Sequence, residues 1–241
     1  STPSSPETLD DRSEAAPALH ATAREATPRD IYFLLVPGVM LLDFAGTADT
    51  FRVAANFGAP FTLHFVGPVE SLASSVGLRL SGVEPLPPQL PEGAIVIVSG
   101  AAVSARDYAR PEAAVAARWL ARTVGPTQLL CTVCSGIFLA AQSGAIDGRR
   151  CTTHHVLTSR LAREFPSLHV VDNRIFVRDG NLLSGAGVTA GVDLALHVLS
   201  ELCGPHLAAD VARHLVIYFR RSDDDPRVQA WREEAPRADQ L

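Results

Sequence analysis

The sequence predicts an α/β protein, a three-layer sandwich in which helices cover both faces of a mostly parallel central sheet. Strand-like and helix-like segments alternate along the chain, and this order is typical of parallel sheets. The strand-like segments at 31–36 and 94–98 are continuously apolar, and the segment at 128–133 is apolar except for Gln128 and Thr132, as expected for strands that are buried on both faces. The 241 residues are 47% hydrophobic and 20% charged, which is sufficient for one ordinary globular core.

The first half of the chain contains three of the buried strands and two helices. Pro37-Gly38 and Gly67-Pro68 mark the ends of the first two strands, because both dipeptides favour turns. A proline at the start of the second helix occupies a position that helices favour. The expected elements are the strand 31–36, a helix over 47–56, the strand 61–66, a short hairpin within 76–83, the strand 94–98 and a helix over 111–123.

The second half continues the alternation and ends in two helices. Asp179-Gly180 lies between two apolar runs and predicts the turn of a β-hairpin. Gly204 is expected to end the first of the two terminal helices. The expected elements are the strand 128–133, a helix that ends near 143–144, an extended segment at 151–153, a helix over 157–164, a strand at 168–171, the hairpin 174–177 and 181–184, and helices over 189–202 and 205–219.

The two ends of the chain differ from the middle in composition. Residues 1–29 are rich in Ser, Pro, Ala, Glu and Thr without apolar periodicity, so we expect a disordered leader. The tail 222–241 is acidic and contains prolines. The predicted organisation is therefore a leader at 1–29, one domain at 30–221 and a C-terminal tail at 222–241.

Charge and hydropathy exclude several classes of partner. The net charge is -5 and no basic stripe is present, which argues against binding of nucleic acid through this chain alone. No apolar run reaches the length of a membrane span, so no membrane association is expected. The N-terminus lacks the basic start and apolar centre of a signal peptide, and we expect a cytoplasmic protein.

Cys134 is the leading candidate for a functional side chain. It ends the apolar strand 128–133 and precedes Ser135-Gly136, which opens a helix-forming run. A side chain at such a strand-to-helix corner is pushed out of the sheet, as in the nucleophile elbow of hydrolases. Ligands of open α/β sheets bind at this edge. The alternative is that Cys134 is a small buried hydrophobic residue, as many free cysteines are.

The other cysteines indicate neither a disulfide framework nor a metal site. Cys131-x-x-Cys134 has the spacing of redox and zinc motifs, but Cys131 falls inside the strand. A zinc site would need a second Cys or His pair at matching spacing, and none is present. We therefore expect no metal and no cofactor.

Further candidates lie near the ends of the other strands. Asp43 is either a site carboxylate or the N-cap of the following helix. Gly100 and its neighbour Ala101 follow the strand 94–98, and the N–H near Gly100 could form an oxyanion hole with that of Ser135; an ordinary turn glycine is the alternative. One of His154 and His155 is a candidate pocket donor or base.

These motifs together resemble the DJ-1/PfpI superfamily, a branch of the class I glutamine-amidotransferase-like folds with a flavodoxin-like sheet. The chain is most similar to the N-terminal domains of GlxA-type regulators of the AraC family, and is also similar to isonitrile hydratases. The resemblance runs from about Ile31 to Trp231. The matching stretches are 41–46, 98–100, 134–136, 144–150, 152–154 and 187–197.

Three departures from the family pattern bear on function. Thr47 stands where the branch often has proline, and His155 where it often has tryptophan. Ser135 follows the cysteine where protease-like members have histidine, so the resemblance does not support a Cys-His protease dyad. The regulators continue into helix-turn-helix units, whereas this sequence stops soon after Trp231. It is either a sensor domain of a longer chain or a protein without a DNA-binding half.

The resemblance implies a homodimer and leaves two main functions open. The first is a small-molecule-sensing domain of an AraC/GlxA-type transcriptional regulator, with Cys134, Asp43 and Gly100 lining the pocket. The second is a hydratase in which the Cys134 thiolate attacks carbon and Asp43 transfers protons. A third is a redox role, which requires Cys134 to be exposed. In each case Ala101, Ser135 and His154 are expected to contact the ligand or substrate.

Overall fold

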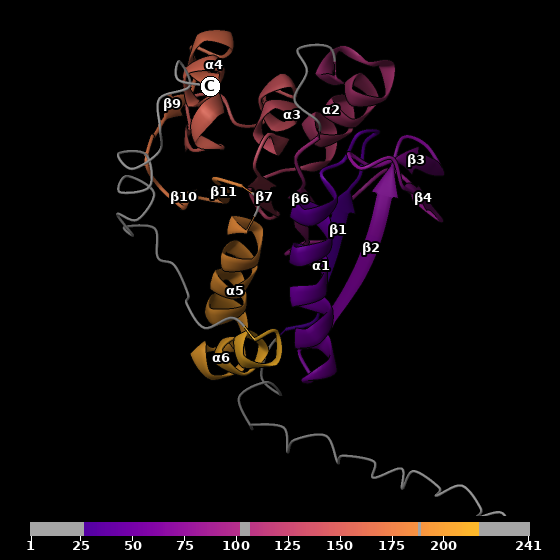
Figure 1. The fold of residues 1–241 in the computed structure, drawn as a ribbon, viewed down its shortest axis with the longest axis vertical. Helices are drawn as coiled ribbons and strands as arrows, with labels where there is room; N and C mark the ends of the chain where they lie inside the picture. The colour runs from indigo at the N-terminus through magenta and orange to yellow at the C-terminus, as the bar shows by residue number, and fades with distance from the viewer. Residues whose placement is uncertain (1–26, 102–106, 188, 217–241) are drawn as a thin grey trace, which may run out of the picture.

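A computed structural model describes residues 27–101, 107–187 and 189–216 and contains a seven-stranded central sheet (Figure 1). The strands lie in the spatial order β10-β11-β7-β6-β1-β2-β5. Their bounds are β1 Arg29–Leu34, β2 Phe61–Gly67, β5 Glu84–Pro85, β6 Ile95–Val98, β7 Leu129–Val133, β10 Phe176–Asp179 and β11 Leu182–Gly185. Two short pairs lie outside this sheet: β3 Ser71–Ala73 with β4 Arg79–Ser81, and β8 Arg150–Cys151 with β9 His169–Val170.

The central sheet is parallel except for the edge strand β10, which is antiparallel to β11. Counted along the chain, the five strands from β2 to β11 in space follow the order 2-1-3-4-5, which is the flavodoxin-like order. In this order the chain changes direction between β1 and β6. The carboxyl ends of β1, β6 and β7 therefore lie side by side at the edge where such sheets bind ligands.

Helices cover both faces of the sheet and confirm the predicted three-layer sandwich. On one face lie α1 (Leu41–Asn56), α5 (Ala190–Cys203) and α6 (Pro205–His214), and on the other α2 (Pro111–Thr123), α3 (Gly136–Gln142) and α4 (Thr158–Glu164) (Figure 1). Alternate residues of one strand belong to different cores: Phe33 packs in the first layer and Leu34 in the second. This explains why the strands are apolar without alternation.

Helix α1 begins earlier than the sequence indicated. It starts at Leu41, whereas the helix predicted from the sequence starts at Thr47. Glycine is unfavourable in a helix interior, so Gly46 does not indicate the earlier start. The structure explains this glycine. A Cβ at Gly46 would lie 3.1 Å from Val192 Cγ2 of α5, and a Cβ at Gly191 would overlap the Thr47 hydroxyl. The two glycines allow α1 and α5 to pack closely.

Other expected elements differ only in their ends. The hairpin predicted within 76–83 is displaced toward the N-terminus: β3 at 71–73 pairs with β4 at 79–81, and Val76 lies in the connecting turn. Helix α6 ends at His214, and the predicted continuation beyond residue 216 lies outside the described residues. The leader residues 1–26 and the tail 222–241 also lie outside them. Every helix that the structure describes is too short or too polar to cross a lipid bilayer.

Candidate functional site

Cys134 occupies the predicted corner between β7 and α3. Its backbone φ is +55°, in the left-handed region that residues other than glycine seldom adopt. The backbone N–H of Cys134 donates to the carbonyl oxygen of Gly185 over 3.0 Å, which holds the corner against β11. Such local strain persists only where the surrounding structure imposes it, and it is concentrated at functional sites. The side chain is nevertheless buried, with 5% of its surface exposed.

The loops after β6 and β11 approach Cys134 at the carboxyl edge of the sheet. A Cβ at Gly100, after β6, would lie 2.6 Å from Asp43 Oδ2 and 3.1 Å from Cys134 Cβ. The carboxylate and the cysteine therefore both pack against the backbone of Gly100, where a methyl group would overlap the carboxylate. A Cβ at Gly187, after β11, would lie 2.9 Å from Cys134 Sγ. The absence of a side chain at these two glycines lets the backbone approach the thiol and the carboxylate.

Asp43 is a buried acid in the first turn of α1. It is not the N-cap, which is Met40, so the alternative interpretation of this aspartate was wrong. Burial raises the pKa of Asp43 from 3.8 to about 6, and this effect outweighs the lowering by the Cys134 thiol and the Gly100 N–H. Neither carboxylate oxygen accepts a well-formed hydrogen bond from the described residues. Asp43 is therefore an acid that changes charge close to neutral pH.

The Ser135 hydroxyl is used entirely within the protein. It donates to the carbonyl oxygen of Ala101 over 2.8 Å and accepts from the Ala101 N–H over 3.1 Å. The Tyr108 hydroxyl donates to the carbonyl oxygen of Ser135 over 2.6 Å and lies 3.3 Å from the Ala101 nitrogen. These bonds fasten the loop after β6 to the elbow, and they occupy the backbone N–H of Ala101.

Three residues near the site were not predicted as site residues. Tyr108 fastens the elbow, and burial raises the pKa of its hydroxyl. The Thr153 hydroxyl donates to the Cys134 carbonyl oxygen over 2.8 Å, and Gly187 covers the sulfur. Thr153 and Gly187 lie in the stretches 152–154 and 187–197, which match the family pattern. That match is the only feature of the sequence that indicates a place near the site. Nothing local in the sequence marks Tyr108.

His154 follows Thr153 but faces a different neighbour. Its Nδ1 accepts from the Val156 N–H over 3.4 Å, and its ring lies 4.4 Å from that of His155. Burial and the neighbouring His155 lower the pKa of His154. None of its hydrogen bonds or ring contacts reaches Cys134 or Asp43. The structure thus brings together Asp43, Gly100, Ala101, Cys134 and Ser135, and leaves His154 beside them.

The remaining cysteines are not suited to redox chemistry at this site. Cys131 is fully buried, and burial raises the pKa of its thiol to about 12. The redox hypothesis also required an exposed Cys134, and that expectation was wrong because Gly187 and Gly100 enclose the side chain. Among the described residues, no three His, Cys, Asp or Glu side chains form a group that could hold a metal ion.

Replacing Tyr108 by Phe should destabilise the protein by about 1 kcal/mol, the usual net contribution of one hydrogen bond. The substitution removes the bond from the Tyr108 hydroxyl to the buried Ser135 carbonyl oxygen, which keeps its second donor, the Phe138 N–H, over 3.0 Å. Urea denaturation measures the change. The matched control is Tyr32→Phe, because Tyr32 stacks on His64 and its hydroxyl makes no hydrogen bond with the described residues. Equal effects of the two substitutions would show that Tyr108 does not fasten the elbow.

Comparison with known sequences relates the whole domain to one family. The sequence model of the DJ-1/PfpI family matches residues 29–201. The HTH-type transcriptional regulator CdhR of Pseudomonas aeruginosa is 30% identical over 207 residues, which make up 83% of this chain and 59% of CdhR. Isonitrile hydratase of Pseudomonas putida is 31% identical over 183 residues, 72% of each chain. The chain thus spans little more than half the length of CdhR.

Solved structures have the same architecture. A THiJ/PfpI family protein from Pseudomonas syringae superposes with a TM-score of 0.67 at 20% identity, covering 92% of this chain and 93% of that protein. An AraC family transcriptional regulator from Pseudomonas putida superposes with a TM-score of 0.62 at 21% identity, covering 78% of this chain and all of the solved chain. At these identities the similarity establishes the fold.

Proposed function

The chain belongs to the DJ-1/PfpI family, and on this basis we propose that it is the small-molecule-sensing domain of an AraC/GlxA-type transcriptional regulator. Cys134, Asp43 and Gly100 line the sensor site, and Gly187 bounds it. The DNA-binding part of such a regulator lies outside the matched region, as the 59% coverage of CdhR suggests.

The observation that carries this proposal is the engagement of the backbone donors around Cys134. Catalysis of the amidase type needs N–H groups directed at the developing negative charge. Here the Ala101 N–H is bound by Ser135 and Tyr108, and the Gly100 N–H faces Asp43. Because the Ala101 N–H is already bound within the protein, the loop after β6 is better suited to recognition than to turnover.

Asp43 indicates the chemistry of the ligand. Its two buried oxygens accept no well-formed hydrogen bond from the described residues, so both retain their capacity to accept one. A ligand that presents N–H or O–H donors would satisfy them and would favour the charged form of the acid. Since the pKa of Asp43 is about 6, binding of such a ligand should strengthen as the pH rises from 5 to 7.

The alternative is a hydratase acting on isonitriles or similar small electrophiles. A carboxylate with a pKa of about 6 beside a cysteine thiol is suited to moving a proton to or from substrate and water. The similarity to isonitrile hydratase over 72% of the chain supports this reading. In that reaction the Cys134 thiolate would attack carbon and Asp43 would act as acid and base.

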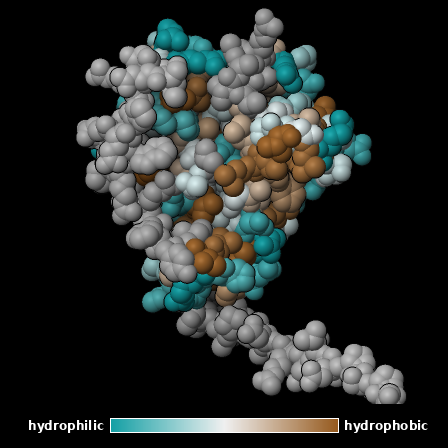
Figure 2. Space-filling model, viewed as in Figure 1, coloured by the Kyte–Doolittle hydropathy of each residue, from teal (hydrophilic) through white to brown (hydrophobic). Residues whose placement is uncertain are grey.

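We also propose that the protein is a cytoplasmic homodimer. Leu42, Val76 and Leu78 are more than half exposed, although all three are large and apolar. Figure 2 shows apolar surface over the first turn of α1 and beside the β3–β4 hairpin, the elements that carry these side chains. Exposed apolar surface of this kind is common where proteins associate.

Replacing Gly187 by Ala should abolish ligand binding at the site. The methyl group would lie 2.9 Å from Cys134 Sγ and would occupy the space in front of the thiol. A screen of polar metabolites by thermal shift should yield ligands that raise the Tm of the wild-type protein and not that of the variant. Gly148→Ala is the matched control, since Gly148 also has a positive φ of 75° but has no neighbouring atom within 4 Å of its Cβ position. Ligands that stabilise Gly187→Ala as well as wild type would refute a sensor site at Cys134.

A further inference from the structure

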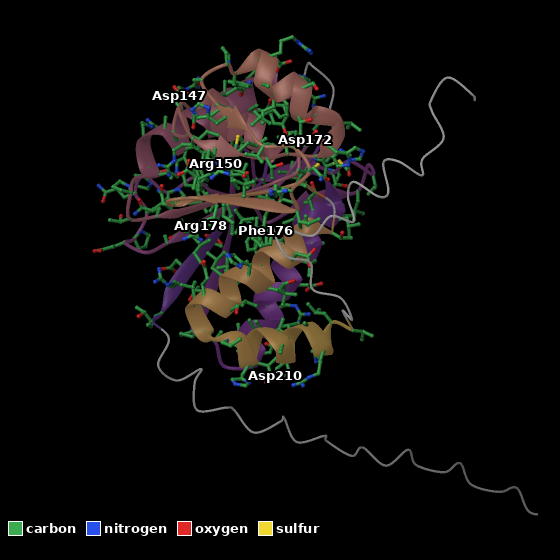
Figure 3. All side chains as sticks on the ribbon, turned by 90° about the vertical axis from the view of Figure 1, so that its left-hand side faces the viewer. Asp147, Arg150, Asp172, Phe176, Arg178 and Asp210 are labelled. Atoms are coloured by element: carbon green, nitrogen blue, oxygen red, sulfur yellow. The ribbon has the colours of Figure 1, made fainter. Side chains whose placement is uncertain are left out.

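A second cleft lies at the opposite end of the sheet from Cys134. It has a volume of about 250 Å³ and opens where β7 and β11 begin, while Cys134 and Gly187 follow the ends of these strands. Six of its lining side chains are apolar: Val124, Pro126, Leu130, Ala145, Ile146 and Leu182. In Figure 3, Asp147, Arg150 and Arg178 lie toward this end of the sheet and Asp172 toward the other.

Arg149 contributes a fixed cation to this cleft. Its Nη2 donates to the carbonyl oxygen of Asp179 over 3.0 Å and to Asn181 Oδ1 over 2.5 Å. Asn181 is itself held by donation from its Nδ2 to the carbonyl oxygens of Gly125 and Gln128. The guanidinium is therefore oriented before any ligand arrives, and little side-chain entropy remains to be lost on binding.

Most of the donors of this guanidinium have no acceptor. Arginine carries five N–H groups, and the hydrogen bonds of Arg149 within the described residues use only Nη2. Its Nε is buried without a hydrogen-bond partner and lies 4.0 Å from Asp179 Oδ2. That carboxylate already accepts from the Arg150 N–H over 2.8 Å. The Arg150 guanidinium forms no ion pair with the described residues, and Arg149 is the charged side chain among those that line the cleft.

We propose that this cleft binds a small carboxylate whose hydrocarbon part is branched or cyclic. The Nη1 donors of Arg149 remain unused, and they can bind a carboxylate oxygen with charge assistance. The apolar walls favour a ligand with an apolar body over inorganic phosphate or sulfate, because those ions would leave the walls in contact with water or with charge. The site is separate from Cys134, so it is independent of the proposed sensor function.

The test is a titration of the ¹⁵N-labelled protein with isovalerate, followed by backbone amide shifts. We expect saturable shifts at Gly125 and Leu182, and binding at least about tenfold weaker for the neutral isovaleramide and for phosphate. Arg149→Gln should weaken isovalerate binding about tenfold. Ala145→Phe, which fills the cleft and keeps the hydrogen bonds of Arg149, should do the same. Arg150→Gln is the control for general surface charge and should bind as wild type does.

Several outcomes would overturn the proposal. Absence of saturable shifts would mean that the cleft holds only water. Equal binding of isovaleramide or phosphate would exclude recognition of a carboxylate with an apolar body. An equal loss in Arg150→Gln would indicate a diffuse basic surface. If Arg149→Gln does not fold, Ala145→Phe decides alone, and unchanged binding in that variant refutes the site.

Discussion

Replacing Asp43 by Asn is expected to stabilise the folded protein at pH 8 and to leave its stability almost unchanged at pH 4. Burial raises the pKa of Asp43 from 3.8 in the unfolded chain to about 6 in the folded protein. Between these values the folded state binds more protons than the unfolded state, so the contribution of Asp43 to stability falls as the pH rises. Above about pH 6 the ionised Asp43 lowers the free energy of unfolding by its full amount, about 3 kcal/mol. Asn avoids this cost because it carries no charge.

The measurement is the free energy of unfolding of wild type and variant in urea at several values between pH 4 and pH 8. Taking the difference at each pH cancels the titration of all other groups. Asp49→Asn in the same helix is the control, since Asp49 is exposed and its ion pair within the described residues is with Arg52. Its difference should stay small at every pH. A stability gain in Asp43→Asn that is equal at pH 4 and pH 8 would contradict a buried acid with a raised pKa.

Replacing Gly136 by Ala is expected to destabilise the protein by about 3 kcal/mol or more. The new methyl group would overlap the carbonyl oxygen of Val98 and would lie 2.9 Å from its carbonyl carbon and 3.0 Å from that of Ser99. These are backbone atoms in the middle of the sheet, so they cannot move aside as a flexible side chain does. The clash falls directly after the elbow and would shift Cys134 relative to Asp43.

Gly125→Ala provides the matched control for this effect. Its Cβ would lie 3.4 Å from the side-chain oxygen of Gln128, an ordinary contact, and the φ of neither glycine is in the left-handed region. Thermal and urea unfolding should place the control close to wild type. If Gly136→Ala proved as stable as Gly125→Ala, the close approach of α3 to β6 would be incorrect.

The α/β architecture could be predicted from the sequence because each strand and helix has a local pattern of apolar residues that agrees with its place in the fold. Continuous apolar runs such as Ile31–Val36 can be buried on both faces only in a sheet covered by helices on each side. The elbow at Cys134 was predictable for a similar reason: an apolar strand followed at once by Ser-Gly has few other conformations. The positive φ of Cys134 agrees with that interpretation.

What could not be predicted depends on contacts between distant segments. The early start of α1 rests on the fit of Gly46 against Val192, which no local propensity indicates. Ser135 was expected to contact a ligand and to offer its N–H, and nothing local indicated that Ala101, 34 residues away, would bind both the donor and the acceptor of its hydroxyl. The burial of Asp43, and with it the raised pKa, is likewise a product of packing.

Incubation with small isocyanides, followed by proton NMR, tests most directly whether the Cys134 site recognises or converts its ligand. One spectrum reports binding, through broadened ligand signals, and conversion, through new product signals. A sensor predicts that product never exceeds the molar amount of protein. Product that accumulates over many turnovers in the wild-type protein, and that is absent in both Cys134→Ser and Asp43→Asn, would contradict the sensor proposal and establish the hydratase.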